Sequence, residues 1–542
     1  MKLICDIFNN FFLSISNLFP SVCPSFTIPF IRLSLNYFYF KTVSPYDVDK
    51  YISKLKKTSP GYDNLSAQTL ENLIPWEIEH FTCIINKIIT KSVYPPELKI
   101  ARIIPIYKSG ERNLTENYRP IAILPVYSKL IEKILCNQLM DYLNNTHFFN
   151  SNQFGFLKGS DTAIASINLI QHIQESIDKG KITATLFIDL RKAFDTIKHI
   201  LIDKISKMNL CYDAVLLLKS FLNNRKQFVK LNNDVSDTKT IQCGVPQGSV
   251  LAAPLFIIFI NDIFDINLKG KIQLYADDIA ITYSCNSVNI LKEYMQQDLE
   301  SLQNYFDRNM LIMNEKKSYC IVFRTRENKL DNLIITINNK PLQRVGEVKY
   351  LGLVISKELN WVEHINKIKK KIIPFVGVFK RLMSYLPQKT LINIYYAHIH
   401  THLTYMSPIW ASAPKYKIKE LCVLQNKVIK LILRKPRLTP SISLYGSMFM
   451  SLENIIKFNQ IILIYKIQNQ LIRHNIQIKS NFEVHGYNTR TSYNLRLRSG
   501  ETCIGTNSIL NGAIEQYNDI SNALQNLDSF KSFKSELKRC LK

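Results

Sequence analysis

Two adjacent aspartates, Asp277 and Asp278, interrupt an apolar segment, and they constrain this chain more than any other feature. The segment IQLYADDIAITYS, residues 272–284, contains two short β-prone runs with the aspartates between them, which predicts a β-hairpin. Carboxylates side by side at the tip of an apolar hairpin repel each other unless their charge is compensated. Divalent cations would do this, because Mg²⁺ takes hard oxygen ligands together with water and substrate phosphates. A solvated polar turn is the alternative interpretation.

A third carboxylate, Asp189, ends another apolar run. The run TATLFID, residues 183–189, is rich in β-formers and predicts a buried strand. Together with the hairpin pair, Asp189 would hold two metal ions about 3.5–4 Å apart, an arrangement that activates an attacking oxygen and stabilises the leaving one in phosphoryl transfer. A helical pattern starts near Asp195, which we expect to be the N-cap.

Strand and helix signals interleave between residues 45 and 355, which predicts an α+β body. Residues 101–110 predict a strand ending in a glycine turn, and a longer helix is expected at 126–143. Beyond Trp361 the helical signals dominate. An apolar stripe near the end predicts a helix that docks on a core or a partner; its members are Leu527, Phe530, Phe533, Leu537 and Leu541.

The charge of the chain is strongly basic, with 69 lysines and arginines against 43 acidic residues and a net charge of +26. Residues 361–542 hold 27 basic and 9 acidic residues, whereas residues 1–360 hold 42 and 34. Such a balance predicts a polyanionic partner, either nucleic acid or an acidic membrane surface. No uninterrupted apolar stretch reaches the ~20 residues that span a bilayer.

Cysteine and histidine, which ligate transition metals, are present, but their spacing in the sequence does not match that of a metal site. The eleven cysteines are scattered without a C-x-x-C pair, which argues against a zinc module and favours a reduced intracellular compartment. His398, His400 and His402 have no cysteine or acid at useful spacing, so an aromatic-rich helix is favoured over a metal site. The N-terminal apolar run is interrupted by polar residues and predicts a helix of the fold rather than a signal peptide.

Five sequence blocks occur in one order: NYRPIAILPVYSKLIEKIL (117–135), FIDLRKAFDTIKH (187–199), GVPQGSVL (244–251), YADD (275–278) and YLGLVI (350–355). Together they resemble the reverse transcriptase of a non-LTR (LINE-type) retrotransposon, closest to the jockey-like elements. The resemblance covers about residues 45–360. The trailing YNTR at 487–490 and the last forty residues also resemble the carboxyl extension of such proteins.

The resemblance implies a right-hand polymerase fold, an α+β body of fingers, palm and thumb with a helical basic C-terminal extension. The implied domains are a helical lead-in (1–44), fingers and palm (45–360, with a core at about 90–356), a helical thumb (361–440) and the basic extension (441–542). Only about 45 residues precede the fingers, too few for the apurinic-class endonuclease that such elements carry. A truncated copy, a processed fragment or an incomplete gene prediction is therefore expected.

The implied activity is that of an RNA-directed DNA polymerase, which adds dNTPs to a primer 3′-hydroxyl. Asp189, Asp277 and Asp278 would be the catalytic and metal-binding residues, with two Mg²⁺ ions, or Mn²⁺ in their place. The implied partners are template RNA, a DNA primer or nicked target DNA, and dNTPs, with no membrane. Nuclear localisation is expected from this lifestyle without a clear targeting signal, and the sequence indicates no oligomeric state.

Three basic residues match positions at which the family contacts the nucleotide. Lys108 and Arg119 match fingers residues that grip the triphosphate; arginine gives bidentate phosphate contacts and lysine a mobile point charge. Lys317 matches the lysine proposed to protonate the leaving pyrophosphate. Exposed basic residues of no special function are the alternative for all three.

Phe194, Gln247 and Gly248 also match nucleotide-binding positions. Phe194 lies where the family has an aromatic gate against a ribose 2′-hydroxyl; a core phenylalanine is the alternative. Gln247 and Gly248 would lie against the incoming nucleotide, the glycine allowing close backbone approach. The family usually has proline four positions after the serine of this block, where this chain has Ala253 and then Pro254. This shift leaves the start of the following helix in question.

A basic amphipathic segment opens the expected thumb. Lys367, Lys369, Lys370 and Lys371 flank isoleucines, and we expect them to follow the phosphates of the template–primer duplex. A solvated helix face is the alternative.

Two other functions share part of the evidence for the whole chain: a catalytically inactive nucleic-acid-binding remnant of a retroelement, and a group II intron or telomerase-type reverse transcriptase.

Overall fold

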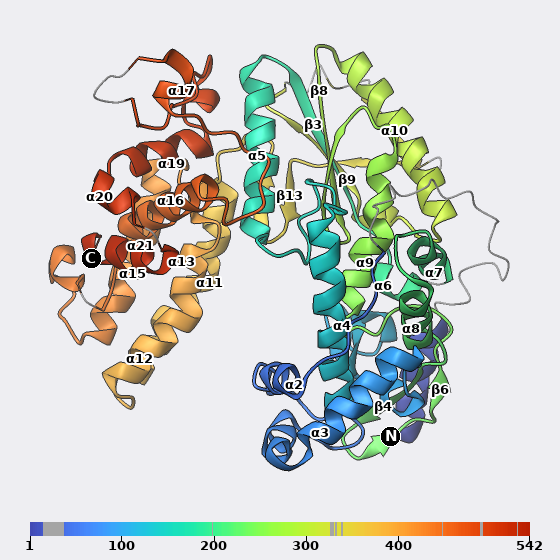
Figure 1. Ribbon diagram of the computed structural model, residues 1–542. Coiled ribbons are helices and arrows are strands. Elements are labelled where there is room, and N and C mark those ends of the chain that lie inside the picture. Colours follow the sequence, from blue (N-terminus) through green and yellow to red (C-terminus); the bar gives the residue numbers. More distant parts are fainter. Residues whose placement is uncertain are drawn as a thin grey trace. The chain divides into compact units, whose positions relative to one another are not determined.

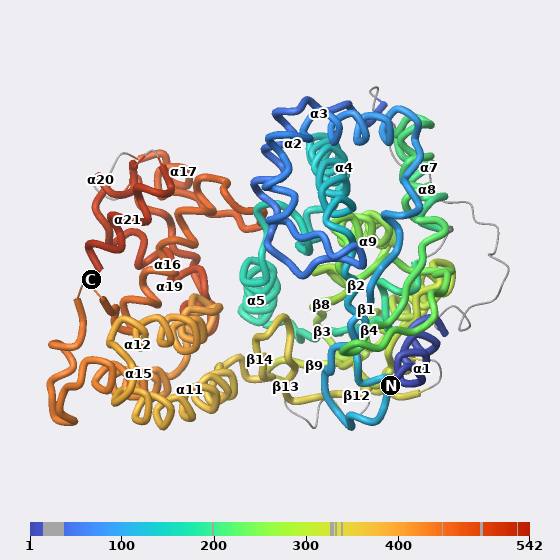
Figure 2. Tube along the Cα trace, turned by 90° about the horizontal axis from the view of Figure 1, so that it is seen from below, coloured from blue at the N-terminus to red at the C-terminus, as the bar shows by residue number. Residues whose placement is uncertain are grey.

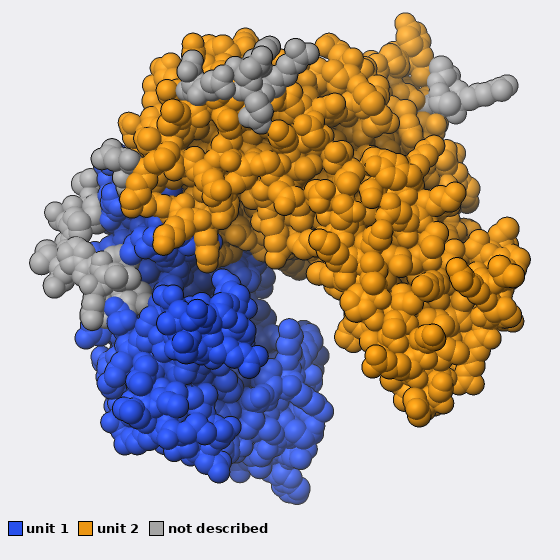
Figure 3. Space-filling model, turned by 180° about the vertical axis from the view of Figure 1, so that it is seen from behind, with its two compact units in different colours: residues 1–156, 189–267, 301–314 blue, residues 157–188, 268–300, 315–542 orange. Residues whose placement is uncertain are grey.

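The structure is a computed structural model, and it describes residues 1–14, 37–197, 199–325, 330, 333–337, 340–446, 448–487, 492–527 and 529–541. The chain divides into two compact units, coloured separately in Figure 3. Unit 1 comprises residues 1–156, 189–267 and 301–314, and unit 2 comprises residues 157–188, 268–300 and 315–542. Strands and helices mix in both units, so the chain has the mixed α/β character that the sequence predicts.

The sheet of unit 1 is built around β1 (Ile100–Tyr107), as the apolar run at 101–110 predicts. It pairs antiparallel with β2 (Tyr118–Ile123) and parallel with β4 (Lys226–Leu231); Figure 2 shows the three side by side. Two short strands, β5 (Asp234–Val235) and β6 (Lys239–Thr240), pair with β4. The N-terminal helix α1 (Lys2–Leu13) buries Phe8 and Phe12 against this sheet, which confirms it as part of the fold.

The helices of unit 1 are, besides α1, α2 (Pro45–Ile52), α3 (Ala67–Lys91), α4 (Val126–Asn145), α6 (Ala193–Thr196), α7 (His199–Ser206), α8 (Tyr212–Leu222) and α9 (Ala252–Ile260), with short turns η2 (Pro96–Lys99), η3 (Thr115–Asn117) and η4 (Asn261–Asp265). The predicted helix at 126–143 is confirmed as α4. Helix α9 is apolar on all sides, and almost all of its residues are buried, as expected for a central core helix.

The sheet of unit 2 has the strand order β12 (Gln343–Arg344), β9 (Tyr319–Phe323), β3 (Ile182–Ile188), β8 (Asp278–Cys285) and β7 (Lys271–Tyr275). Strand β3 is central, and six of its seven residues are buried, which explains its continuous run of apolar and threonine side chains. Helix α5 (Thr162–Asp178) packs against β3, β7 and β8; Figure 1 shows it beside β3 and β8. Smaller pairs are β10 (Thr336–Ile337) with β11 (Lys340–Pro341), and β13 (Glu347–Tyr350) with β14 (Leu353–Ser356). Helix α10 (Val288–Arg308) begins in unit 2 and ends in unit 1.

Beyond Trp361 unit 2 is helical, as predicted. The elements are α11 (Val362–Leu382), α12 (Gln388–Tyr395), the π-helical turn η7 (Tyr396–His400), α13 (Thr401–Thr404), α14 (Ser407–Trp410), α15 (Lys415–Ile432), η8 (Ser441–Leu444), α16 (Leu452–Gln468), α17 (Asn481–His485), α18 (Cys503–Thr506), α19 (Ile509–Asn518), α20 (Asn522–Gln525) and α21 (Phe530–Cys540). The docking helix expected near the end is α21. Its Phe533 stacks on Tyr465 of α16 with ring centroids 3.8 Å apart, and Phe533 and Leu537 are fully buried.

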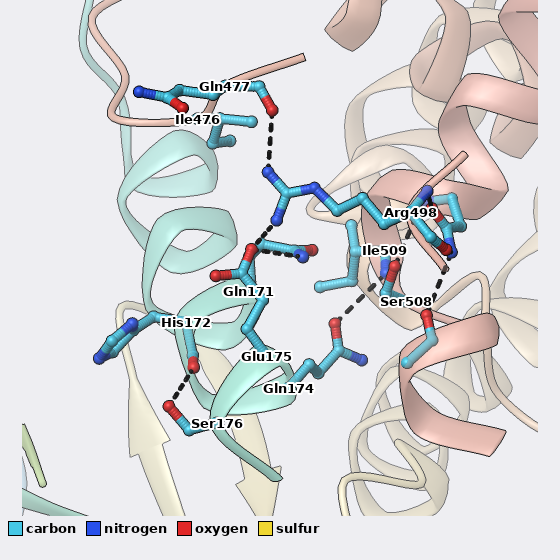
Figure 4. A network of polar contacts seen from close by, with 12 residues as sticks. Gln171, His172, Gln174, Glu175, Ser176, Ile476, Gln477, Arg498, Ser508 and Ile509 are labelled. Atoms are coloured by element: carbon cyan, nitrogen blue, oxygen red, sulfur yellow. Dashed lines mark hydrogen bonds and ion pairs between the residues drawn. The ribbon is translucent and has the colours of Figure 1, made fainter. Parts of the chain in front are cut away.

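The C-terminal part of unit 2 is fastened to helix α5 by polar contacts (Figure 4). Arg498 forms an ion pair with Glu175 and donates a hydrogen bond to the Gln477 carbonyl. Asp178 accepts hydrogen bonds from both the backbone N–H and the hydroxyl of Thr502, each at 2.8 Å. Residues 488–490 of the YNTR segment lie outside the described residues.

Candidate active site

The predicted hairpin around the two aspartates is confirmed. Strands β7 and β8 pair antiparallel, with Tyr275 opposite Asp278, so Ala276 and Asp277 form the two-residue turn. Ala276 is buried and has a φ of 57°, the left-handed region that costs a non-glycine residue of the order of 1 kcal/mol. Asp277 is half-buried, and Asp278 is exposed as the first residue of β8. We name residues 271–285 the YADD hairpin.

One end of the unit 2 sheet collects several of the predicted site residues. Strand β3 ends at Ile188 opposite Ile279 of β8, next to the aspartates of the hairpin. Strand β9 runs antiparallel to β3 and begins at Tyr319, at the same end of the sheet. Lys317, which is exposed, lies just before β9 in η5 (Glu315–Lys317). Asp189 is the next residue of the chain after Ile188.

Asp189 itself is oriented by a neighbour within unit 1. The Asn314 side-chain amide donates a 2.7 Å hydrogen bond to Oδ2 of Asp189, and the Asn314 backbone N–H donates to the Asp189 carbonyl at 2.8 Å. Sequence reasoning assigned no role to Asn314, because it lies 125 residues away along the chain. The only available signal was its position directly before the Glu315–Lys317 segment.

The three aspartates have the hard oxygen donors that Mg²⁺ prefers. Across the parts of the chain that the structure describes, no three His, Cys, Asp or Glu side chains are grouped closely enough to hold a metal ion. Mg²⁺ is typically bound by only one or two carboxylates, with substrate phosphates and water completing its shell. The adjacent carboxylates of the YADD hairpin therefore fit Mg²⁺ in donor type.

The three histidines considered in the sequence lie in and next to a π-helical turn. Residues 396–400 form this turn, a rare local geometry. His398 stacks on Phe375 with ring centroids 5.1 Å apart, and His400 contacts Tyr396 edge-on at 4.9 Å. Their contacts are therefore those of an aromatic-rich helix.

The GVPQGS block forms a turn that packs directly on strand β2 of the same unit. We name residues 246–251 the QG turn. The Ala122 N–H donates to the Gln247 carbonyl at 2.7 Å. Gly248 has a φ of 131°, and a Cβ atom there would collide with the carbonyl oxygen of Ala122. Glycine is therefore required at this position by both conformation and space.

The Gln247 side chain is held by Asp195, with which it lines a small cavity of about 50 Å³ in unit 1. The amide of Gln247 donates a 2.8 Å hydrogen bond to Oδ1 of Asp195. Burial raises the pKa of Asp195 to about 6, opposed by this hydrogen bond and by the charge of Lys192. The prediction of Asp195 as a helix N-cap is wrong: α6 begins at Ala193, and the Asp195 carboxyl contacts Gln247 instead of capping the helix.

The two predicted triphosphate contacts come together on the β1–β2 pair. Arg119 lies in β2 opposite Ile106, and Lys108 directly follows β1, its N–H donating to the Asn117 carbonyl at 2.8 Å. Both side chains are exposed at the same end of the pair.

Phe194 packs into the core around α9. Its ring stacks on Phe256 with centroids 4.5 Å apart and meets Phe156 edge-on at 6.4 Å. Phe194 remains half-buried. The displaced Pro254 is the third residue of α9, where a backbone N–H has no partner within the helix, so the shift does not disturb the helix start.

The four lysines at the start of α11 divide into two kinds. Lys370 and Lys371 are exposed, whereas Lys367 and Lys369 are half-buried. The ammonium group of Lys369 contacts the carboxylate of Glu420 at 2.8 Å. Burial lowers the pKa of Lys367. Lys370 and Lys371 are therefore the better placed of the four to meet a phosphate backbone.

No helix in the described ranges combines the length and apolar character needed to cross a membrane.

Residues 106–355 match the family described as reverse transcriptase (RNA-dependent DNA polymerase). This match spans both units and includes all three aspartates.

Three of the curated relatives are RNA-directed DNA polymerases from mobile elements of Drosophila species. The chain is 29% identical over 408 residues to the probable RNA-directed DNA polymerase from transposon BS of Drosophila melanogaster, covering 72% of this chain and 45% of that protein. It is 28% identical to the probable RNA-directed DNA polymerase from transposon X-element of the same species (69% and 42% covered). It is 27% identical to the RNA-directed DNA polymerase from mobile element jockey of Drosophila funebris (72% and 44%). The chain thus spans less than half the length of these relatives.

Proposed function

We propose that this chain, whose residues 106–355 match the reverse transcriptase family and whose relatives belong to jockey, BS and X-element transposons, is the RNA-directed DNA polymerase of a non-LTR retrotransposon. It would copy template RNA by adding dNTPs to the 3′-hydroxyl of a DNA primer or of nicked target DNA. Nuclear localisation is part of this proposal.

One observation carries the proposal: the register of the unit 2 sheet. Because Ile188 pairs with Ile279, the chain continues from β3 into Asp189 at the end of the sheet where the YADD hairpin turns. A strand register is fixed by the backbone ladder, so this placement does not depend on side-chain rotamers. Lys317 enters β9 at the same end, which supports its role as the group that protonates the leaving pyrophosphate.

The same assignment gives the parts of the chain their roles. Residues 45–360 would form fingers and palm, residues 361–440 the thumb, and residues 441–542 a basic extension. Lys108 and Arg119 on the β1–β2 pair would hold the triphosphate, with Gln247 and Gly248 against the nucleotide and Phe194 near its ribose. The exposed Lys370 and Lys371 would contact the duplex phosphates directly, and the half-buried Lys367 and Lys369 would contribute less.

Asp189, Asp277 and Asp278 would hold Mg²⁺, or Mn²⁺ in its place. When bound, two such ions would favour deprotonation of the primer 3′-hydroxyl and neutralise charge on the leaving group. The contribution of the chain itself is orientation: Asn314 fixes the direction of the Asp189 carboxylate, and the paired strands fix the hairpin. The primer oxygen bonds to the α-phosphate as the bond to pyrophosphate breaks, and Lys317 supplies a proton to the pyrophosphate.

Primer extension on an RNA template tests the proposal. Asp277→Asn should lower extension by at least about 1,000-fold, because a metal-binding carboxylate is lost while the turn keeps its shape. Binding of the primed template should remain within about twofold of the parent. Asp213→Asn, at an exposed position in α8, is the matched control and should leave extension unchanged.

Equal extension by Asp277→Asn and the parent would overturn the assignment of the site. A parent protein that binds primed RNA but never extends it would favour the alternative, a nucleic-acid-binding remnant.

A further inference from the structure

A fully buried carboxylate in unit 1 has a role that the proposed mechanism does not use. Glu132 lies in helix α4 and is 0% exposed. Its Oε1 accepts a 2.8 Å hydrogen bond from the Ser128 hydroxyl. Its Oε2 accepts from the backbone N–H groups of Val250 and Leu251 at 2.7 and 3.3 Å, and from the Ser249 hydroxyl. A buried carboxylate is tolerated only when it is hydrogen-bonded in this way.

The charge of Glu132 is compensated by a buried cation. Arg225, 1% exposed, lies close enough for its charge to interact favourably with Glu132, and this interaction opposes the effect of burial, which lowers the pKa of Arg225. The Tyr94 hydroxyl contacts the Ser128 hydroxyl at 3.0 Å. The carboxylate therefore belongs to a buried polar network, and hydrogen bonds in such a network restrict the backbone groups that take part in them.

All the donors that meet Oε2 belong to one end of the QG turn. Residues 249–251 follow Gly248 directly, and the other side of the turn is held by Ala122, whose N–H donates to Gln247. The turn is thus fixed from two directions, by β2 on one side and by Glu132 on the other. Without the carboxylate, the Val250 N–H would lose its acceptor, the Leu251 N–H would keep only its contact with the Ser249 hydroxyl, and the turn would lose one of its attachments.

We propose that Glu132 is a positioning residue for the incoming dNTP. Its carboxylate holds the QG turn so that Gln247 and Gly248 present a fixed surface to the nucleotide, and Glu132 itself touches no substrate. This inference rests on the proposed function, in which that turn contacts the nucleotide. It predicts a defect in nucleotide binding rather than in metal chemistry or template binding.

Steady-state primer extension at varied dNTP concentration tests this role. Glu132→Gln keeps the shape of the side chain but places an N–H₂ group among donors, so the KM for dNTP should rise about tenfold while kcat falls by less than about threefold. The Kd for primed template should not change. Glu79→Gln, at an exposed position in α3 of the same unit, is the control and should match the parent.

Ser249→Ala provides a second, milder variant that removes one donor and keeps the carboxylate. It should raise the KM for dNTP about threefold while the protein remains folded at the assay temperature. Because both residues act through one contact, the double variant should show less than the product of the two single effects.

The outcomes separate the two proposals. If the parent extends a primer and both variants keep the parental KM, or if the two effects simply multiply, Glu132 does not position the turn. A loss of kcat alone, or a loss that parallels the unfolded fraction measured by circular dichroism, overturns the role as well. If the parent itself never extends a primer, the proposed function fails and this inference fails with it.

Discussion

The QG turn of unit 1 and the YADD hairpin of unit 2 carry two of the sequence blocks that best match the reverse transcriptase family, yet they are held in opposite ways. The hairpin is fixed by its own ladder, in which all five residues of β7 pair with residues 278–282 of β8, and β8 pairs again with β3. The QG turn has no ladder. It is held by Ala122, Asp195 and Glu132, which belong to separate segments of the chain.

The difference between the YADD hairpin and the QG turn agrees with the different roles proposed for them. The proposed metal binding by the hairpin requires accessible carboxylates, and Asp278 is exposed at the start of its strand. A turn that presents its backbone to a substrate must not move, so its polar groups are engaged with the protein. Substitutions in the turn should therefore affect stability, whereas substitutions at the hairpin tip should affect activity with little change in stability.

The largest stability effect is expected at Gly248. Gly248→Ala should lower the free energy of unfolding by about 3 kcal/mol, because the new Cβ meets the Ala122 carbonyl at a strained φ. Urea unfolding measures this. Gly346→Ala is the control, since a Cβ there meets nothing within 4 Å among the described residues, and it should change stability by less than about 0.5 kcal/mol. Equal effects of the two substitutions would contradict the close packing of the turn on β2.

The contact between Gln247 and Asp195 should make stability depend on pH. Burial raises the pKa of Asp195 from its ordinary 3.8 to about 6, so between these values the native state holds a proton that the unfolded chain has lost. The contribution of Asp195 to the free energy of unfolding therefore decreases as the pH rises from 3.8 to about 6. The free energy of unfolding of Asp195→Asn should be about 2 kcal/mol higher than that of the parent at pH 7.5 and equal to it near pH 4. Parallel curves of unfolding free energy against pH for the two proteins would refute this.

The same contrast between engaged and accessible groups occurs among the lysines of α11. Lys371→Gln should lower the slope of log Kd against log salt for a primed template by about 1, because the substitution removes an exposed ammonium group that would contact one phosphate. Lys369→Gln should change the slope by less, since Glu420 already pairs with that ammonium group. Filter binding at several salt concentrations compares them. A larger slope change for Lys369→Gln would reverse the assignment.

The smallest effect is expected at the tip of the YADD hairpin. Ala276→Gly relieves a left-handed alanine but increases the freedom of the unfolded chain, so the two contributions nearly cancel. The free energy of unfolding should change by less than about 1 kcal/mol. A loss above 2 kcal/mol in thermal or urea unfolding would mean that the hairpin is held by the buried alanine side chain rather than by its ladder.

Features that depend on neighbouring residues were predictable from the sequence. The alternation of residues 272–284 predicts the hairpin, and the β-rich run at 183–189 predicts β3, each to within a residue or two. The helix at 126–143 follows from apolar spacing in the same way. The three aspartates proposed as catalytic stand out because the strands that carry them can be recognised from neighbouring residues.

Features that depend on distant residues were not predictable. The partners of Glu132 in the QG turn lie 117 to 119 residues away, and nothing in the motif around Glu132 distinguishes a turn-holding carboxylate from an ordinary helix residue. Asp195 precedes a helical pattern and so resembles an N-cap, but its partner Gln247 is 52 residues further on. Only the folded chain shows that Glu132 holds backbone N–H groups and that Asp195 holds the Gln247 side chain.

The fastening of helix α5 by Arg498, Thr502 and Ile509 has a consequence for synthesis on the ribosome. The backbone N–H of Ile509 that meets Gln174 of α5 is made 335 residues later. At roughly 5–20 residues per second, α5 waits about 20–70 s for these partners to be translated. During that interval its polar groups face water or a chaperone. A chain whose synthesis ends before residue 498 would therefore have helix α5 without these C-terminal contacts.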